Sequence, residues 1–348
     1  MRRFLVGTYT SDRAARGLYL CALDARGRID VRGVCATDDP SFVVLHPRLP
    51  LAYVVNELPN RDGAVSAIAL DGDRMTVRQR VETGGGAPCH LTLAHDARTL
   101  AVAQYDGATV AWFDVGAEGR IVPPPRLTRH TGASVHPKRQ TSPHPHCTVV
   151  GGASVYVADL GLDCVVQYDR ESTAERSRCA IHAGAGPRHL CLDVAAGFGW
   201  LANEIDNSVS RLAIARDGRL REVDWTTTLP ADFSGRSYVS EIARHPSGAT
   251  LYVGNRGHDS IAWFSIGTGG ALRFEGTVPT RGAHPRHFAL TPDGTTLVVA
   301  NRDSDSLTVY DVDARGRPVP LGEPFTGVPA PVCVRWLKGE ARPATTRN

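Results

Sequence analysis

Lysine, methionine and aromatic residues are scarce in this sequence. Lysine occurs only at Lys138 and Lys338, methionine occurs twice, and aromatic residues make up 7% of the 348 residues. No stretch approaches the roughly 18 consecutive apolar residues of a membrane-spanning helix. Residues 1–10 contain two arginines but no long apolar segment and no small-residue cleavage site, so we expect no secretory signal and no membrane partner.

The cysteines and the net charge argue against further classes of protein. None of the eight cysteines forms a C-x-x-C pair, which argues against a zinc ribbon or a redox dithiol. In a chain of this length they are typical of small buried hydrophobic residues in a reducing compartment, which predicts a cytoplasmic protein. The formal net charge is only +3, which is too small to indicate a nucleic-acid partner.

Glycine and proline, by contrast, are plentiful, with 35 and 23 residues. They divide the chain into short segments, which suit strands better than long helices. Residues 244–256 match residues 290–302 at a spacing of 46, and weaker copies of the pattern occur elsewhere. Each copy predicts two strands joined by a tight turn, a third strand of alternating residues and a poorer fourth strand. Units of this length and strand number are typical of β-propeller blades.

The first strands of these units are predicted to begin near residues 41, 89, 146, 188, 240, 286 and 332, which makes seven units. The last unit stops after its first strand, and the N-terminal residues 4–36 supply the three strands that it lacks. We therefore predict an all-β fold, a seven-bladed β-propeller whose last blade is closed by N- and C-terminal strands. The predicted domain covers residues 1–340, followed by a polar tail at 341–348. Because closure removes edge strands, we expect a monomer or a weak dimer.

The longest segment without repeat character runs from Pro123 to Pro145 and begins with three prolines. It predicts a loop inserted before the third blade. Two interpretations stay open, namely a solvated loop and a lid over the mouth of the central channel, because long loops in compact domains are often functional.

Propeller topology predicts where polar side chains gather. The connection into the first strand of each blade and the loop after the second strand lie on one face, around the central channel. Arginine binds carboxylates or phosphates through paired hydrogen bonds, and His and Glu transfer protons near neutral pH. The residues at these positions therefore predict a site for a small anionic substrate. They include His90, His144, His146, Arg188, His189, Glu204, Arg256, Arg286, His287 and Arg302.

Each of these residues, taken alone, also has a structural interpretation. The Pro-Arg-His segments at 187–189 and 285–287 would also cap the entrance to a strand. Glu57 holds the same blade position as Glu204, and position does not choose between them. His144 and His146 are spaced as metal ligands could be, but no acidic cluster accompanies them, so we expect no metal and no cofactor. A non-catalytic interaction platform would not need His, Arg and Glu at one mouth, which favours an enzyme.

At these residues the sequence resembles the seven-bladed lactonase family, which includes bacterial 6-phosphogluconolactonases of the propeller type and fungal 3-carboxy-cis,cis-muconate lactonizing enzymes. The resemblance covers almost the whole chain. It implies a metal-independent active site in the central channel, with the family's functional residues at His146, Arg188, Glu204 and Arg256. The motifs that carry it stand at residues 6–10, 143–146, 184–189, 203–209 and 255–261.

The resemblance further implies a lactonase that hydrolyses a sugar lactone, foremost 6-phosphogluconolactone, in the pentose phosphate pathway. In this hypothesis Glu204 or His146 is the general base that activates a water, and His144 could exchange roles with His146. Arg188 and Arg256 stabilise the oxyanion or hold the anionic group of the substrate. The alternatives are lactonization of a carboxymuconate and a non-catalytic interaction platform. Contacts to the substrate are predicted for His90, His144, His189, Arg286, His287 and Arg302.

Overall fold

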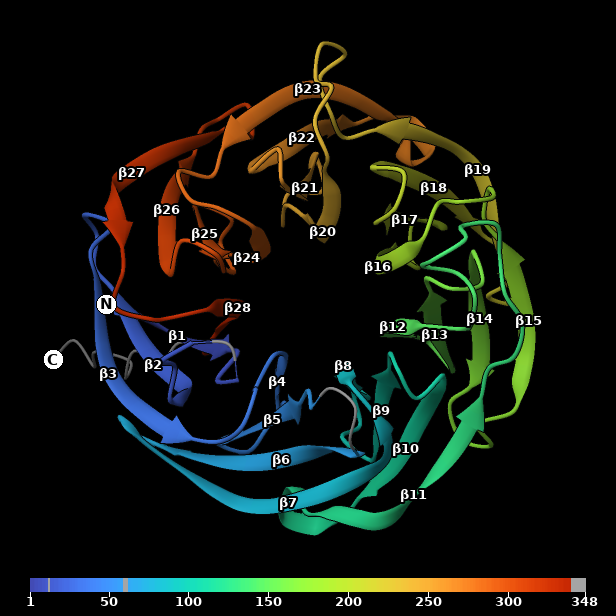
Figure 1. The fold of residues 1–348 in the computed structure, drawn as a ribbon, viewed down its shortest axis with the longest axis horizontal. Coiled ribbons are helices and arrows are strands. Elements are labelled where there is room, and N and C mark those ends of the chain that lie inside the picture. Colours follow the sequence, from blue (N-terminus) through green and yellow to red (C-terminus); the bar gives the residue numbers. More distant parts are fainter. Residues whose placement is uncertain (12, 59–61, 339–348) are drawn as a thin grey trace, which may run out of the picture.

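Each sequence repeat folds into one four-stranded antiparallel sheet, and seven such sheets form a ring, whose centre is called the channel below (Figure 1). The structure is a computed structural model that describes residues 1–11, 13–58 and 62–338. The all-β seven-bladed propeller predicted from the sequence is confirmed. The predicted domain boundary at residue 340 and the polar tail at 341–348 lie outside the described residues.

The blades are numbered here in chain order and their strands are given from the channel outward. Blade 1 contains β4 (Val43–Leu45), β5 (Leu51–Asn56), β6 (Asp62–Asp71) and β7 (Arg74–Gly86). Blade 2 contains β8 (Pro88–Leu93), β9 (Thr99–Gln104), β10 (Thr109–Val115) and β11 (Ile121–Arg129). Blade 3 contains β12 (Pro145–Gly151), β13 (Ser154–Asp159), β14 (Cys164–Asp169) and β15 (Glu175–Ala180). Blade 4 contains β16 (Pro187–Asp193), β17 (Phe198–Asn203), β18 (Ser208–Ile214) and β19 (Leu220–Thr227).

Blade 5 contains β20 (Tyr238–Arg244), β21 (Thr250–Arg256), β22 (Ser260–Ile266) and β23 (Leu272–Pro279). Blade 6 contains β24 (Pro285–Leu290), β25 (Thr296–Asn301), β26 (Ser306–Val312) and β27 (Pro318–Phe325). Blade 7 contains β28 (Pro331–Trp336), β1 (Arg2–Thr8), β2 (Gly17–Leu23) and β3 (Ile29–Ala36). Single 3₁₀ turns, η1 (Ala117–Gly119) and η2 (Thr268–Gly270), precede the outer strands of blades 2 and 5.

The two ends of the described chain meet in blade 7. Strand β28 pairs antiparallel with β1, so that Leu5 lies opposite Arg335 and Val6 opposite Val334. Each inner strand also contacts the inner strand of the next blade, including β28 with β4. The ring is therefore closed by main-chain hydrogen bonds within one blade, as the sequence predicts, and no strand edge is open at the junction.

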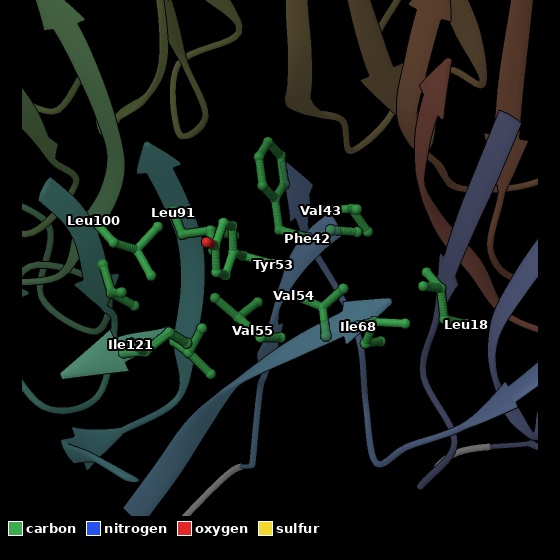
Figure 2. Packing of buried hydrophobic residues seen from close by; sticks show 14 of the residues in the cluster. Leu18, Phe42, Val43, Tyr53, Val54, Val55, Ile68, Leu91, Leu100 and Ile121 are labelled. Atoms are coloured by element: carbon green, nitrogen blue, oxygen red, sulfur yellow. The ribbon is translucent and has the colours of Figure 1, made fainter. Parts of the chain in front are cut away.

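The second strands are buried along nearly their whole length because neighbouring blades cover both of their faces, and their polar residues stand at the strand ends. Every residue of β5 is buried, as is every residue of β13. Apart from its buried first residue, the outer strand β19 contains only exposed and partly buried residues. Side chains from three adjacent blades meet in one cluster, in which Leu18 of blade 7 and Leu100 of blade 2 flank Tyr53 of blade 1 (Figure 2). Apolar side chains of neighbouring blades thus pack against one another, and this packing fixes the positions of the inner strands around the channel.

The predicted start of the insertion, at Pro123, is wrong. Residues 123–129 belong to β11, the outer strand of blade 2, and not to a loop. Prolines are tolerated there because an outermost strand need not donate hydrogen bonds on its free side. The loop between blades 2 and 3 is therefore residues 130–144, and its second part reaches the channel mouth.

Candidate active site at the channel mouth

A β-bulge near the start of the inner strand presents one extra side chain in each of blades 2, 3, 4 and 6. Pro187 and His189 pair with adjacent residues of β17, so Arg188 is the extra residue of the bulge. The same register shift makes His146 and Arg286 the extra residues of β12 and β24, and Cys89 that of β8. Because a bulge redirects a side chain and occurs often beside active sites, the Pro-x-His/Cys pattern is the local sequence signal for this arrangement.

A second set of side chains lies at the end of the second strand of each blade. In five of these strands the last or next-to-last residue is a buried amide, which bonds to hydroxyl groups of the same blade or to the main chain. The Nδ2 of Asn203, for example, donates to Ser208 and Ser210 at 2.8 Å each. This anchors the strand end, so that the next residue is held at the channel mouth. These next residues, including the one after Thr8 in blade 7, are Tyr9, Glu57, Tyr105, Leu160, Glu204, Arg256 and Arg302.

Glu204 lies at the centre of an arginine cluster. Its Oε2 is 2.7 Å from Nη2 of Arg256 and 3.1 Å from Nε of Arg188, and its Oε1 accepts from Nη2 of Arg139 at 2.6 Å. Burial alone would raise the pKa of this carboxyl, but the neighbouring arginines and His146 outweigh it and hold the pKa well below its ordinary value. Glu204 is therefore a permanent anion that holds the three guanidinium groups in place.

The arginines of this cluster also bond to main-chain carbonyls, and one of them keeps an unpaired donor. Arg188 is 3% exposed and also donates to the carbonyl of Ser240 at 2.6 Å. Arg256 donates to the carbonyl of Val239 at 2.7 Å. Within the described part of the chain, the Nε of Arg256 is fully buried and has no hydrogen-bond partner, so this donor is unsatisfied. Burial lowers the pKa of Arg256 to about 10, at which value the group still carries its charge at neutral pH.

The neighbouring histidines are neutral. The Nε2 of His146 lies 4.0 Å from Oε2 of Glu204. Burial, followed by the charge of Arg188, holds the pKa of His146 well below its ordinary value. His284, beside the mouth, has a pKa of about 3 because of burial and the charges of Arg256 and Arg286. Protonation of either ring would add a cation beside existing cations, which is why both stay uncharged.

Glu57 forms a second carboxylate centre on another side of the mouth. Its Oε2 accepts from the hydroxyl of Tyr9 at 2.9 Å, and its Oε1 is 3.8 Å from Nη2 of Arg286. Arg286 also donates to the Tyr9 hydroxyl at 2.5 Å. The guanidinium groups of Arg286 and Arg302 lie 5.1 and 5.4 Å from the Tyr9 ring centroid, as cation–π contacts require.

Below this layer, three histidines narrow the channel. His189 and His287 contact the same carboxylate oxygen of Glu241, at 2.9 and 3.1 Å. His90 packs against Phe42 with ring centroids 4.0 Å apart, and its centroid is 5.2 Å from that of His189. A cavity of about 700 Å³ with mainly apolar walls reaches His90, His287 and Glu241 from the opposite face. The histidine layer therefore separates the charged mouth from that cavity.

The loop at residues 130–144 is anchored on blade 3 and supplies one side chain to the mouth. Gln140 is fully buried and donates to Asp163 at 2.6 Å, and His130 contacts Asp159 at 2.6 Å. Next to this anchor, Arg139 donates to Tyr105 at 3.2 Å as well as to Glu204. The side chain of Arg139 is 33% exposed, so it is the arginine of the cluster that lies nearest to solvent.

The structure brings the predicted residues together in two layers. The four predicted catalytic residues, His146, Arg188, Glu204 and Arg256, share the upper cluster. His144, whose ring stacks on Tyr105 at 4.2 Å, lies at the same mouth. The predicted substrate contacts divide between the mouth, with Arg286 and Arg302, and the lower layer, with His90, His189 and His287. The predicted roles of all these residues stay predictions.

The predicted set of site residues lacks Tyr9, Tyr105 and Arg139. The sequence places Glu57 at the position equivalent to Glu204, but it does not predict the partners of Glu57. Tyr9 and Tyr105 could have been found, because each follows the end of a second strand as Glu204 does. Arg139 carries no such positional signal, since it lies in the inserted loop. Among the residues that the structure describes, no group of three or more His, Cys, Asp or Glu is arranged to hold a metal ion.

Buried charged side chains gathered at one end of a closed seven-bladed ring, with arginines around a carboxylate, are typical of an enzyme active site. The chain belongs to the family described as lactonase, 7-bladed beta-propeller, which matches residues 3–336. The sequence-based assignment to this family is therefore confirmed.

Individual relatives cover between 82% and 97% of the chain. A 6-phosphogluconolactonase of Bacillus subtilis is 29% identical over 342 residues, which span 95% of this chain and 97% of the relative. A 6-phosphogluconolactonase of Formosa agariphila is 27% identical over 303 residues, with 82% and 85% of the two chains covered. The solved structure of a periplasmic gluconolactonase of Pseudomonas aeruginosa superimposes with a TM-score of 0.91 at 29% identity and covers 97% of this chain and 99% of its own.

Proposed function

We propose that this protein hydrolyses the lactone of a sugar acid that carries an anionic group, with 6-phosphogluconolactone as the substrate. The observation that carries this proposal is the charge of the mouth. Four guanidinium groups, from Arg139, Arg188, Arg256 and Arg286, lie around two carboxylates. The excess of cations favours an anionic ligand, and the fork geometry of arginine suits phosphate or carboxylate. The named relatives that act on a phosphorylated lactone support this choice.

In this proposal Arg188 and Arg256 hold the carbonyl oxygen of the lactone as it becomes an oxyanion. Both are buried and already oriented by Glu204 and by main-chain carbonyls. Donors that are fixed before the reaction stabilise the developing charge without having to reorganise. Arg286 and Arg302, near the rim, would take the phosphate.

The histidines would shape the pocket. His144 and His146 line its wall beside Tyr105, and the layer of His90, His189 and His287 forms its floor. A neutral imidazole donates or accepts a single hydrogen bond, which suits the hydroxyl groups of a sugar ring. We propose no metal in this site, since the buried cations already supply the positive charge.

We further propose that the protein works in the cytoplasm, in the pentose phosphate pathway. All eight cysteines are free thiols and seven of them are buried, a usage that suits a reducing compartment. No described helix is long and apolar enough to cross a membrane. Fractionation of the native host, with activity measured in each fraction, tests the location.

A panel of lactones tests the function. Purified protein is assayed on 6-phosphogluconolactone, on unphosphorylated gluconolactone and, in the reverse sense, on a carboxymuconate. We expect kcat/KM to be higher for the phosphorylated lactone by roughly tenfold to a hundredfold, because charged hydrogen bonds to phosphate contribute about 1.5–3 kcal/mol. Hydrolysis in labelled water should place the label in the product carboxylate. Faster turnover of the unphosphorylated lactone, or cyclisation of the muconate, would overturn the substrate assignment.

The same panel is run with a chelator. We expect unchanged turnover, and loss of activity that is restored by adding a divalent cation would contradict the metal-free site.

A further inference from the structure

Two glutamates occupy equivalent positions in the fold. Glu57 follows β5 in blade 1 and Glu204 follows β17 in blade 4, so each is the first residue beyond the second strand of its blade. Figure 1 shows these blades on different sides of the channel, with three sheets between them in one direction. The mouth therefore holds two carboxylates, and their surroundings decide which of them can move a proton.

Glu204 is poorly suited to accept a proton. Both of its carboxylate oxygens already contact guanidinium groups, Oε1 with Arg139 and Oε2 with Arg188 and Arg256. A proton on this group would leave buried cations without their counter-ion, which is the reason for its strongly lowered pKa. Glu204 thus orients the arginines and gives a poor general base.

His146 is poorly suited for a related reason. It is 5% exposed and lies beside Arg188 and His189. A proton on its ring would add a charge next to an existing buried cation. The two general bases expected from the sequence are therefore both held in one protonation state at neutral pH.

Glu57 has a different set of neighbours. The Tyr9 hydroxyl donates to Oε2 at 2.9 Å, whereas Arg286 lies 3.8 Å from Oε1, beyond hydrogen-bond distance. Because Arg286 is too far away to donate to Oε1, this oxygen is able to accept a hydrogen bond from a water. The side chain is 16% exposed, so that water and substrate can reach it at the mouth.

The charged and titratable groups that face Glu57 come from four other blades. They are Tyr9 from blade 7, Cys89 from blade 2, Arg188 from blade 4 and Arg286 from blade 6. Burial raises the pKa of Glu57 above its ordinary value, and Arg286, Ser41, Tyr9 and Arg188 offset only part of this rise. Both Tyr9 and Cys89 have raised pKa values because of burial, so both stay protonated. Two carboxylates with pKa values displaced in opposite directions are typical of a division of roles.

We propose that Glu57 is the proton-transfer residue of this site, held in position by Tyr9, and that Glu204 serves to orient the arginines. The proposal rests on the lactone hydrolysis proposed above. In the first step the Glu57 carboxylate removes a proton from water as the water oxygen bonds to the lactone carbonyl carbon, and the carbonyl π electrons move to its oxygen. In the second step the oxyanion collapses, the bond between the carbonyl carbon and the ring oxygen breaks, and protonated Glu57 gives its proton to the ring oxygen. One water is consumed and Glu57 returns to its starting state.

The test is the pH profile of turnover in Glu57→Gln, with the wild type measured first on 6-phosphogluconolactone. We expect kcat to fall by about 10²–10⁴-fold, the usual contribution of a general acid–base group. KM should change little, and the acidic limb of the kcat profile should disappear. The matched control is Glu82→Gln, the same change on the exposed side of the outer strand β7 of the same blade, which should behave as the wild type.

Tyr9→Phe provides a second readout that does not depend on the folding of the first variant. Because the Tyr9 hydroxyl favours the ionised carboxylate, its loss should raise the pKa of Glu57 and move the acidic limb to higher pH while turnover persists. A wild-type kcat or an unchanged acidic limb in folded Glu57→Gln overturns the inference, as does an unmoved limb in Tyr9→Phe. A wild-type protein that hydrolyses none of the lactones would instead refute the proposed function itself.

Discussion

The strand ends that carry Glu57 and Glu204 differ in what lies beside them and not in how they are built. In both blades a buried asparagine, Asn56 or Asn203, precedes the glutamate and bonds to a serine of the third strand. Glu204 then meets three guanidinium groups within 3.1 Å, whereas Glu57 meets a tyrosine hydroxyl and a more distant arginine.

This difference arises from the neighbouring blades. The partners of Glu204 come from its own inner strand, from blade 5 and from the loop before blade 3. The side chains in contact with Glu57 are Tyr9, which follows β1 of blade 7, and Arg286 of blade 6. A repeat therefore places equivalent residues, and the residues of other repeats set their proton affinity.

The largest effect is expected for Glu204→Gln, which removes the counter-ion of the arginine cluster. Leaving buried cations unpaired costs about 3–5 kcal/mol, whereas Glu57→Gln should cost about 1 kcal/mol for one hydrogen bond. Urea unfolding of both variants at pH 7 measures the contrast. Equal stabilities would contradict the distinction between an orienting and a proton-transferring carboxylate.

The stabilisation by Glu204 should also depend on pH. Its folded pKa lies below the ordinary value of 4.5, so its contribution is complete above about pH 4.5 and is lost as the pH falls through the folded value. The stability difference between the wild type and Glu204→Gln should therefore shrink in acid. A difference that grows on acidification would show that the carboxyl is not held ionised.

Arg188→Ala should lower kcat/KM by roughly 10²–10³-fold, because it removes a fixed donor for the oxyanion. Arg188 also favours the ionised form of Glu57, so its loss should shift the acidic limb of the pH profile upward. Steady-state kinetics across pH measure both effects in one series. Arg188→Lys retains the positive charge but lacks the paired N–H donors of the guanidinium, so its acidic limb should stay at the wild-type pH. An acidic limb that moves equally in both variants would contradict the electrostatic effect of Arg188 on Glu57.

Arg139→Ala should have a smaller effect. This arginine is partly exposed and reaches the mouth from the loop at 130–144, so its ion pair contributes about 1 kcal/mol or less to stability. We expect KM for an anionic lactone to rise by about tenfold or less, with kcat nearly unchanged. A loss in kcat comparable to that of Arg188→Ala would show that the loop supplies catalysis and not only binding.

His182 provides a comparison outside the arginine cluster, because it is one cation between two carboxylates. Its ring contacts Asp206 at 2.6 Å and Glu222 at 2.8 Å, which raise its pKa to about 9 against the opposing effect of burial. The stabilisation of the folded state by the charged His182 ring is fully present below pH 6.5, the ordinary pKa of histidine, and is lost as the pH rises through about 9.

His182→Asn should therefore cost about 1 kcal/mol at pH 6, a figure reduced for solvent screening, and little at pH 10. Thermal unfolding at both pH values measures it, and kcat should not change. A cost that is equal at both pH values would show that the ring acts by packing and not by charge.

Much of the fold could be predicted because similar turn residues recur from one sequence repeat to the next. The predicted first strands begin within two residues of the observed ones, from β4 at Val43 to β28 at Pro331. The start of the insertion could not be predicted in the same way, because three consecutive prolines indicate a loop unless the strand is known to be outermost. That position is a property of the folded blade.

The sequence by itself determined the number of blades, the closure of the ring and the gathering of His, Arg and Glu at one mouth, because each depends on spacing and on alternation along the chain. Only the tertiary structure decided which residues form pairs. The bulged inner strands bring Arg188 to Glu204, the loop adds Arg139, and the meeting of the chain ends sets Tyr9 against Glu57. Spacing along one blade carries no information about its neighbours' side chains, and proton affinity in a buried site depends on those side chains.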